Sequence, residues 1–326
     1  MTEFHVDVVR LGEVRPHPNA DRLEITNVHG GYPCILRKGD FKEGDLAVYV
    51  PIDTVLPNSE RFAFLSDSDR KRLRAKKLRG IFSMGLIIAA DEDMLEGQDV
   101  AERLGVERYE PPEPMTTGGD CESPPQGWFF PHYTDIEGLR RYGDVLTPGE
   151  EVVVTEKIHG ANGRFIHDGE RLWVGSRTQI KKQNPESIWW KAAEGACLEA
   201  RLARFPMKVF FGEVFGQVQD LKYGVKRGVD FRLFDIFDVR AGQYLDHYDC
   251  IHIARELGIP WVPIFHQGPW DPIMAASMCE GTSTLDGADN VREGFVVKPV
   301  VERFDERVGR VILKMHGQGY LLRKGK

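Results

Sequence analysis

The chain has 326 residues, of which 41% are hydrophobic and 29% charged, and its formal net charge is -7 at pH 7. This length suffices for two domains that each bury a core. The acidic balance excludes indiscriminate nucleic-acid binding through overall charge, so any such binding depends on local basic patches.

No apolar run approaches the roughly 18 residues of a membrane span, and the polar start is not a signal peptide. We therefore predict a soluble, cytoplasmic protein without membrane partners. The five cysteines are odd in number, far apart and without C-x-x-C spacing. This pattern predicts free, mostly buried thiols and indicates neither a disulfide framework nor a structural zinc site.

Residues 1–109 contain short β-like runs separated by glycine-containing turns, at 5–11, 22–28, 32–36, 46–50 and 81–89. Several short strands of this kind predict a small β-barrel. The loop from Pro16 to Leu23 resembles a loop of tRNA-binding modules of the OB type, which bind nucleic acid through one face and its flanking loops. That resemblance implies an OB-like nucleic-acid-binding module at 1–109. A barrel with a purely structural role is the alternative.

Residues 70–79 concentrate positive charge in an otherwise acidic chain. Cations that neutralise phosphates release counterions and strengthen binding at low salt, so this segment is a candidate nucleic-acid contact. A solvated surface is the alternative interpretation. The candidate residues are Arg70, Lys71, Arg72, Arg74, Lys76 and Lys77.

Residues 110–127 are rich in proline and glycine and cannot sustain a ladder or a helix, so they predict a linker. The second domain is then 128–326. We expect a hairpin at 162–167 and 171–175, one helix from Asn184 to about Leu202, a helix over 248–257 with Gly258 as its cap, and a short helix from Asp271 to near Gly281.

Three apolar runs in this domain, 207–215, 231–239 and 291–300, each include charged residues. Burial of a charge is costly unless it is paired. Because three independent accidents are a poor explanation, the pattern predicts a polar site between sheets. The charged residues are Glu213, Asp235, Glu293 and Lys298.

Lys157 lies between a β-branched run and Gly160, which predicts a lysine at the end of a buried strand. Such a lysine acts as a nucleophile only if its pocket lowers its pKa from about 10.4 through desolvation or nearby cations. Lys298 and Lys314, in later apolar runs, are candidates for those cations. An ordinary lysine with its amine in water is the alternative.

The segment from Glu156 to Gly160 resembles the lysine motif of the covalent nucleotidyltransferases, a superfamily of ATP-dependent DNA and RNA ligases and mRNA capping enzymes. The histidine of this motif, His159, resembles the form of the motif found in the RNA ligase branch. Further segments follow in the family's order: Ser176 to Thr178, Phe211 to Gly216, Phe231 to Ile236, Glu293 to Pro299 and Val311 to His316. An OB-like module at the amino end, with no further domain after the last motif, resembles one nick-sealing subgroup of RNA ligases.

The resemblance implies an α+β fold, with an amino-terminal OB-like β-barrel followed by a nucleotidyltransferase domain of antiparallel sheets flanked by helices. It also implies three steps: the lysine takes AMP from ATP, AMP moves to a 5'-phosphate end, and a 3'-hydroxyl displaces AMP. The implied partners are ATP and an RNA or RNA-containing nicked duplex, and we expect a monomer.

Site roles are likewise implied by the resemblance. Lys157 would carry AMP, and Glu156 would meet the adenine amino group. Phe234 would stack on adenine, Arg177 and Glu213 would hold the ribose, and Lys298 and Lys314 would contact the α-phosphate.

Glu293 would bind a largely hydrated Mg²⁺ or Mn²⁺, and His159 and Asn162 would orient the lysine, the metal waters or the acceptor phosphate. One departure is His316, where related nick-sealing ligases often have a lysine, so a cation there would depend on pH. A capping or DNA ligase relative, and a non-catalytic nucleic-acid-binding protein, are the alternatives.

Overall fold

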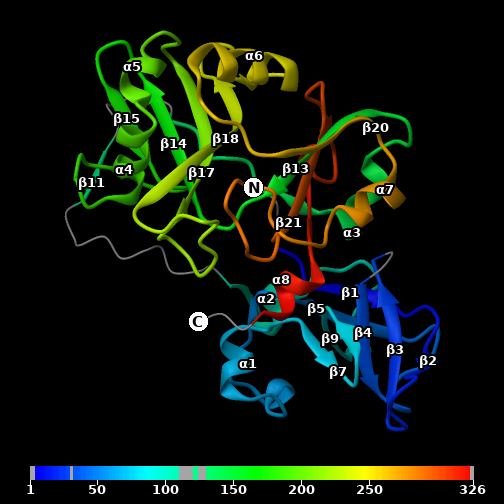
Figure 1. Ribbon diagram of the computed structural model, residues 1–326. Coiled ribbons are helices and arrows are strands. Elements are labelled where there is room, and N and C mark those ends of the chain that lie inside the picture. The colour runs from blue at the N-terminus through cyan, green and yellow to red at the C-terminus, as the bar shows by residue number, and fades with distance from the viewer. Residues whose placement is uncertain (1–3, 30–31, 110–119, 124–129, 324–326) are drawn as a thin grey trace. The chain divides into compact units, whose positions relative to one another are not determined.

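The computed structural model describes residues 4–29, 32–109, 120–123 and 130–323. The chain divides into two compact units, Met1–Glu113 and Pro114–Lys326. Both contain short helices and strands, in agreement with the predicted α+β class (Figure 1). The predicted linker at 110–127 lies outside the described residues except for 120–123.

Unit 1 is built mainly from short antiparallel strands. Its elements are β1 (Asp7–Arg10), β2 (Arg15–Pro16), β3 (Leu23–Val28), β4 (Tyr32–Arg37), β5 (Leu46–Pro51), β6 (Thr54–Val55), η1 (Glu60–Phe62), α1 (Asp67–Lys71), β7 (Lys76–Leu78), β8 (Ile81–Ser83), β9 (Gly85–Ala89), α2 (Ala101–Leu104) and β10 (Glu107–Arg108). The sheet orders are β1-β5-β9, β2-β3-β4, β7-β8 and β10-β6.

Strand β5 is the centre of unit 1, because its two faces pack into two different cores. Val48 and Val50 belong to one apolar cluster, whereas Ala47 and Tyr49 belong to another. This alternation follows from the two-residue repeat of a strand. A strand that is buried on both faces explains why the run from 46 to 50 is apolar without interruption.

The predicted OB-like barrel of unit 1 is not one continuously paired sheet, because its described strands form separate ladders. Individual hydrogen bonds connect these ladders to one another. The Met84 amide donates to the Pro33 carbonyl at 2.7 Å, and the Ile35 amide donates to the Ser83 hydroxyl at 3.1 Å. Strand β4 therefore lies against β8 and β9 without continuous pairing.

Unit 2 contains two larger sheets, ordered β11-β16-β15-β14-β17-β18-β19 and β12-β24-β21-β13-β20. Their pairings are antiparallel except for β12 with β24. The strands are β11 (Cys121–Glu122), β12 (Glu137–Gly138), β13 (Glu151–Lys157), β14 (Ala161–His167), β15 (Leu172–Gly175), β16 (Ile180–Lys181), β17 (Lys208–Gly216), β18 (Val229–Asp238), β19 (Gln243–Tyr244), β20 (Ile264–Pro269), β21 (Gly294–Pro299), β22 (Phe304–Asp305), β23 (Gly309–Arg310) and β24 (Leu313–His316).

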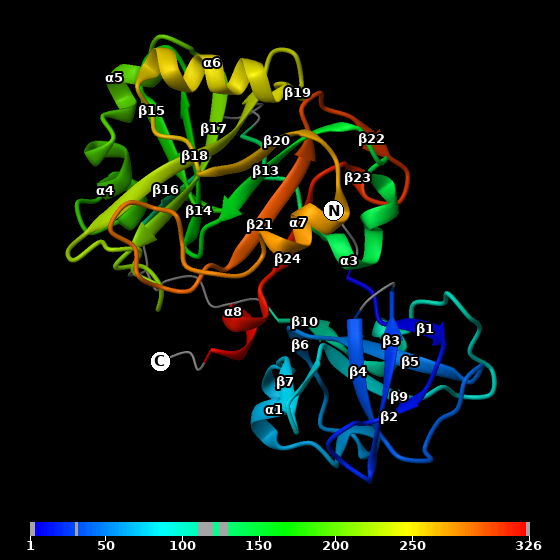
Figure 2. The same ribbon diagram turned by 45° about the vertical axis from the view of Figure 1, so that its right-hand side comes forward.

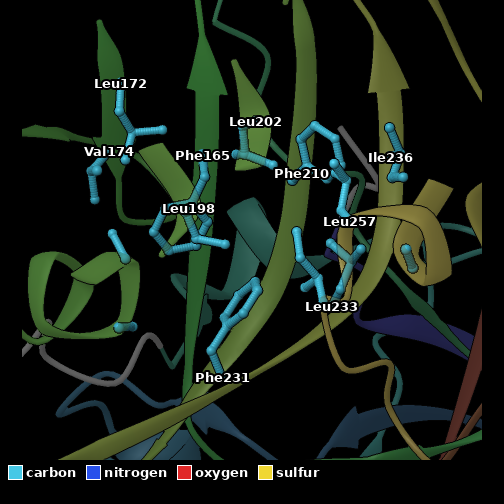
Figure 3. Close-up of a cluster of buried hydrophobic side chains, with 14 of the residues drawn as sticks. Phe165, Leu172, Val174, Leu198, Leu202, Phe210, Phe231, Leu233, Ile236 and Leu257 are labelled. Atoms are coloured by element: carbon cyan, nitrogen blue, oxygen red, sulfur yellow. The ribbon is translucent and has the colours of Figure 1, made fainter. Parts of the chain in front are cut away.

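The helices of unit 2 are short and cover its sheets (Figure 2). They are α3 (Leu139–Tyr142), η2 (Gly143–Val145), α4 (Ile188–Gly195), α5 (Leu198–Leu202), α6 (His247–Leu257), α7 (Pro272–Ser277) and α8 (Gln318–Leu322). Helices α4, α5 and α6 pack on β14, β17 and β18, and Figure 3 shows the apolar side chains of that core, among them Phe165, Phe210 and Leu257. One face of the larger sheet is thereby covered, while residues that alternate with these along the strands, among them Ile166, Trp173 and Phe211, belong to a second buried apolar cluster.

The predicted helix from 184 to 202 is wrong as a single element. It begins later, with Ser187 at its N-cap position, and divides into α4 and α5 because Cys197 has a left-handed backbone with φ of 49°. The other two predicted helices are present, although α7 ends at Ser277 rather than near Gly281. Gly258 (φ 64°) ends α6, and the Asp271 carboxylate accepts from the amides of Ile273 and Met274 at the start of α7.

All five cysteines are free, with Cys34, Cys250 and Cys279 buried. Burial raises the pKa of each of these three thiols to about 12, so they are unreactive packing residues. Within the described parts of the chain, no helix has the length and apolarity to cross a bilayer.

The imidazole of His247, at the start of α6, predicts acid sensitivity of unit 2. His247 is 1% exposed, and burial lowers its pKa to about 4. The unfolded chain takes up this proton near pH 6.5, whereas the folded chain resists it until about pH 4. The free energy of unfolding should therefore fall by up to about 3 kcal/mol as the pH decreases across that window.

Urea denaturation at several pH values tests this expectation. In His247→Gln the fall should be smaller than in the parent, whereas His252→Gln, which changes an exposed histidine of the same helix, should leave it unchanged. Equal pH profiles for the parent and His247→Gln would contradict the assignment.

Candidate active site

Lys157 is the last residue of β13, and the chain turns directly into β14. The turn passes so close to β17 that a Cβ on Gly160 would lie 2.3 Å from the Val214 carbonyl oxygen. Only glycine fits this approach without a shift of backbone. The turn thus takes the chain from Lys157 in one sheet to β14, the middle strand of the other sheet.

Glu293 is the direct partner of Lys157, with Nζ 2.8 Å from Oε1. Register explains the meeting, since Lys157 lies opposite Gly294 in β21, and Gly294 lies opposite His316 in β24. Gly294 has φ of 151°, and a Cβ there would lie 1.9 Å from the Met315 carbonyl oxygen. A glycine after Glu293 is therefore required by the packing of β21 on β24.

The pocket does not lower the pKa of Lys157 as the sequence predicted. Burial lowers it, but the carboxylates of Glu293 and Glu213 outweigh burial, and the net shift is upward. In this state the amine is a cation. It becomes nucleophilic only when positive charge neutralises the neighbouring carboxylates.

Glu213 and Asn162 face each other on β17 and β14. Burial, with a further contribution from Glu293, raises the pKa of Glu213 to about 8, although Lys157 opposes the shift. At neutral pH Glu213 is therefore largely protonated and can donate as well as accept a hydrogen bond. The Oδ1 atom of Asn162 is buried and has no hydrogen-bond partner within the described residues.

His159, two residues after Lys157, is fixed by two side chains. Its Nε2 lies 2.9 Å from Asp220 Oδ1, and its Nδ1 lies 3.0 Å from the Tyr320 hydroxyl. Burial lowers the pKa of His159, although Glu293 opposes the shift, so the ring is neutral. The carboxylate then accepts from Nε2–H, and the Tyr320 hydroxyl donates to Nδ1.

The last described residues of the chain complete this arrangement. Arg323 Nε donates to Asp220 Oδ2 at 2.9 Å, and the Tyr320 ring stacks on His316 at a centroid distance of 5.7 Å. Sequence reasoning missed Asp220, Tyr320 and Arg323, because nothing in their local pattern indicates contact with a residue more than 60 positions away.

His316 Nε2 lies 3.4 Å from Glu293 Oε1. Burial lowers the pKa of His316, although a hydrogen bond from its ring to the Glu293 carboxylate opposes the shift. The ring is accordingly neutral at neutral pH in this state. The pH-dependent cation expected in place of a lysine is therefore absent at neutral pH.

Lys298 belongs to a different cluster from Lys157. Its Nζ lies 2.9 Å from both Asp235 Oδ1 and Glu302 Oε1, and Arg310 Nη2 lies 2.7 Å from Asp235 Oδ2. Along β21, Lys298 is four residues from the Lys157 level, or ~13 Å at about 3.3 Å per residue. The predicted contact of Lys298 with the α-phosphate is not supported by these contacts, because two carboxylates already neutralise the ammonium group.

The single polar site predicted between the sheets is thus two clusters. One contains Lys157, Glu213 and Glu293, and the other contains Asp235 and Lys298. Lys314 lies opposite Val296, so its side chain shares the sheet face of Lys157. Lys298 lies on the same face but four residues from the Lys157 level, whereas Lys314 is two residues from it, so Lys314 is the better placed to act beside the nucleophile.

The remaining predicted residues lie around this pocket or at the surface. Phe234 is half-buried, and its ring centroid lies 4.9 Å from that of Tyr133. Glu156 is 2% exposed. Arg177 is exposed and pairs with Asp135.

No group of three His, Cys, Asp or Glu side chains suited to a metal ion occurs in the part of the chain that the structure describes. A hydrated Mg²⁺ or Mn²⁺ needs only one or two carboxylates, with water and phosphate as its other ligands. Glu293 is a buried carboxylate facing Lys157 and two imidazoles, so its donor chemistry fits such an ion.

The basic segment of unit 1 is partly neutralised. Arg70 pairs with Asp67, Arg72 pairs with Asp53, and Lys76 pairs with Asp69. Lys71, Arg74 and Lys77 are exposed. Among the described residues, these three cations form no salt bridge, and neither does Arg79, which the candidate residues omitted.

Arg79 lies at the tip of the β7–β8 hairpin with a left-handed φ of 48°. The loop that resembles tRNA-binding modules holds this hairpin: His17 Nε2 lies 3.1 Å from the Leu78 carbonyl, and Asn19 Nδ2 donates to the Arg79 carbonyl at 3.0 Å. An arginine in a conformation that favours glycine or asparagine is a local cost, and the two hydrogen bonds to the hairpin carbonyls help to hold it.

Comparisons with known proteins show the family and the fold. A family model described as RNA ligase matches residues 150–316, and one for an OB-fold domain matches residues 5–90. The chain is also 30% identical over 93 residues to the phenylalanine–tRNA ligase beta subunit of Anaplasma marginale, a match that covers 28% of this chain and 10% of that protein.

Solved structures of a Naegleria gruberi RNA ligase are similar over almost the whole chain. A mutant with ATP and Mn has a TM-score of 0.83 at 25% identity, covering 98% of each chain. A mutant with AMP and Mn gives the same TM-score, identity and coverage. The enzyme with PPi has a TM-score of 0.80 at 25% identity, again covering 98% of each chain.

Proposed function

The chain belongs to the RNA ligase family, and from this premise we propose that it is an ATP-dependent enzyme that joins 3'-hydroxyl and 5'-phosphate ends of RNA through a lysyl-AMP intermediate. The observation that carries the proposal is the Lys157 amine at the end of β13, 2.8 Å from Glu293 and on one sheet face with Lys314. The similar ligase solved with ATP, AMP and PPi supports it.

In the proposed first step, the Lys157 Nζ lone pair forms a bond to the α-phosphorus while the bond to pyrophosphate breaks. The amine must first lose the proton that the Glu293 carboxylate favours. Glu293 is the residue that would hold Mg²⁺ or Mn²⁺, which when bound supplies positive charge beside the phosphates. Lys314 is proposed to stabilise the negative charge on the α-phosphate oxygens.

The other proposed contacts divide between base, ribose and acceptor. Phe234 would stack on adenine, a contact worth roughly 1 to 3 kcal/mol for a nucleobase. Glu213 and Arg177 would hold the ribose. His159 and Asn162 would orient the lysine or the acceptor phosphate, with Asp220 and Tyr320 fixing the His159 ring.

Incubation with ATP or GTP labelled at the α-phosphate, followed by denaturing gel electrophoresis, tests the proposal. Label from ATP alone is the expected result. Label from GTP alone would favour a capping-type guanylyltransferase, and no label from either would favour a non-catalytic nucleic-acid-binding protein.

We further propose that residues 1–109 form a nucleic-acid-binding module, that 110–127 form a linker and that 128–326 form the catalytic domain. The proposed substrate is an RNA or RNA-containing nicked duplex bound by a monomer. The exposed basic hairpin, with its tRNA-binding-like loop, supports a phosphate-contacting role for the module.

Neutralising the three exposed cations in Lys71→Gln, Arg74→Gln and Lys77→Gln should weaken nick binding and flatten its salt dependence. Each lost phosphate contact removes about 0.9 from the slope of log affinity against log salt on a B-form duplex, so we expect a change of about 2 to 3. A filter-binding titration at several salt concentrations measures it.

The matched control replaces Arg37, Lys38 and Lys42, three exposed cations of the same unit, by glutamine. The control changes the net charge by the same amount as the first triple variant. It should leave the slope of log affinity against log salt near the parental value. An equal loss in both triple variants would mean that overall charge, rather than the basic segment, governs binding.

A further inference from the structure

Glu156 is buried, and one of its two carboxylate oxygens has no hydrogen-bond partner among the described residues. The residue is 2% exposed. Its Oε2 atom accepts two hydrogen bonds from Thr284, one from the amide at 2.9 Å and one from the hydroxyl at 2.7 Å. Oε1 is buried without a hydrogen-bond partner within the described residues. Such an oxygen is costly unless a donor reaches it.

The surroundings of Glu156 are those of the proposed base pocket. Its amide donates to the Pro263 carbonyl at 2.8 Å, next to Val262, and Thr284 precedes Leu285. Val262 and Leu285 belong to one buried apolar cluster, against which Phe234 packs.

Glu156 is also close to the catalytic groups. The Tyr223 hydroxyl accepts a hydrogen bond from the His159 amide at 2.7 Å. Burial is the main cause that raises the pKa of this hydroxyl, and the nearby carboxyl groups of Glu293, Glu156 and Glu213 raise it further. The carboxylate therefore borders both the apolar cluster and the site of nucleotide transfer.

We propose that Thr284 is the positioning residue for nucleotide selection: its two donors occupy Oε2 and so direct the acceptor Oε1 of Glu156 to the 6-amino group of adenine. This inference rests on the proposed function. A carboxylate oxygen only accepts, so it suits the amino group of adenine and repels the 6-oxo group of guanine or hypoxanthine. A site with a buried polar group of this kind rejects an analogue that leaves the group unpaired.

Thr284→Val removes the hydroxyl donor at constant shape while the amide donor remains, and Thr284→Ser keeps both donors. Thr284 is exposed, so neither change disturbs a core. Three nucleotides separate the contact from general binding: ATP, inosine triphosphate with its 6-oxo group, and purine riboside triphosphate without a 6-substituent. Dissociation constants are measured by calorimetry in EDTA, so that no transfer occurs.

The expected result for Thr284→Val is ATP binding weakened about 10-fold, the size of one hydrogen bond to a charged group. Binding of purine riboside triphosphate should stay within about twofold, and the preference for ATP over inosine triphosphate should narrow. Thr284→Ser should resemble the parent. Equal loss for ATP and purine riboside triphosphate, or no loss for either, would overturn the role of Thr284.

Labelling of the parent by ATP distinguishes this failure from failure of the proposed function. If the parent is labelled and Thr284→Val keeps the parental preference, only the inference is lost. If the parent is never labelled yet prefers ATP through Thr284, the proposed ligase chemistry is wrong and the nucleotide site remains.

Discussion

Lys157→Ala should abolish transfer of labelled AMP to the protein, because it removes the amine at the end of β13 that is proposed to attack the α-phosphorus. The variant also leaves the Glu293 carboxylate, 5% exposed, without its cation, and an unpaired buried charge is destabilising. Loss of label therefore has to be separated from loss of fold.

Lys157→Arg is the matched variant. Its guanidinium keeps a permanent positive charge against Glu293 but does not lose a proton at accessible pH, so it cannot attack phosphorus. We expect both variants to be unlabelled and Lys157→Arg to be the more stable in thermal denaturation. Both should still seal a nick whose 5' end already carries AMP, since the lysine is used before that step. Labelling of either variant by ATP would refute the assignment of Lys157.

Lys298→Met should cost about 3 to 5 kcal/mol of stability, the typical effect of removing one partner from a buried ionic cluster. Asp235 is fully buried, and the variant leaves it and Glu302 sharing Arg310 as their only close cation among the described residues. Urea denaturation would measure the loss.

The double variant Lys298→Met with Asp235→Asn tests what Lys298 does. It removes one charge of each sign, so Arg310 and Glu302 can remain paired, and we expect most of the stability to return. If lysyl-AMP formation returns with it, the role of Lys298 is to hold the two sheets together. A stable double variant that still fails to form lysyl-AMP would restore the α-phosphate role.

Features that depend on neighbouring residues were predictable from the sequence. Gly258 ends α6 and Asp271 caps α7 as predicted, because a cap is a local arrangement of a few residues. Lys157 lies at the end of a buried strand, as its β-branched run and following glycine predicted. The order of the family segments was sufficient to identify the RNA ligase family.

Features that depend on distant contacts were not predictable. Lys298 and Asp235 are 63 residues apart, and nothing near either residue indicates that they neutralise each other. The pKa of Lys157 was expected to fall, yet it rises, because Glu293 is 136 residues away in sequence and in direct contact in space. The run from 81 to 89 likewise does not indicate that its two halves, β8 and β9, pair in different ladders of unit 1.

The pairing of β13, β21 and β24 limits which changes of chain length this domain can tolerate. Lys157 with His316, and Thr155 with Lys314, share one face only because each strand keeps its two-residue alternation. One residue inserted into or deleted from β21 between Gly294 and Lys298 would turn Lys298 away from Asp235 and toward the opposite, apolar face. Natural insertions and deletions, and engineered ones, should therefore be tolerated least in these three strands, and also in β23, which supplies Arg310 to the same ionic cluster.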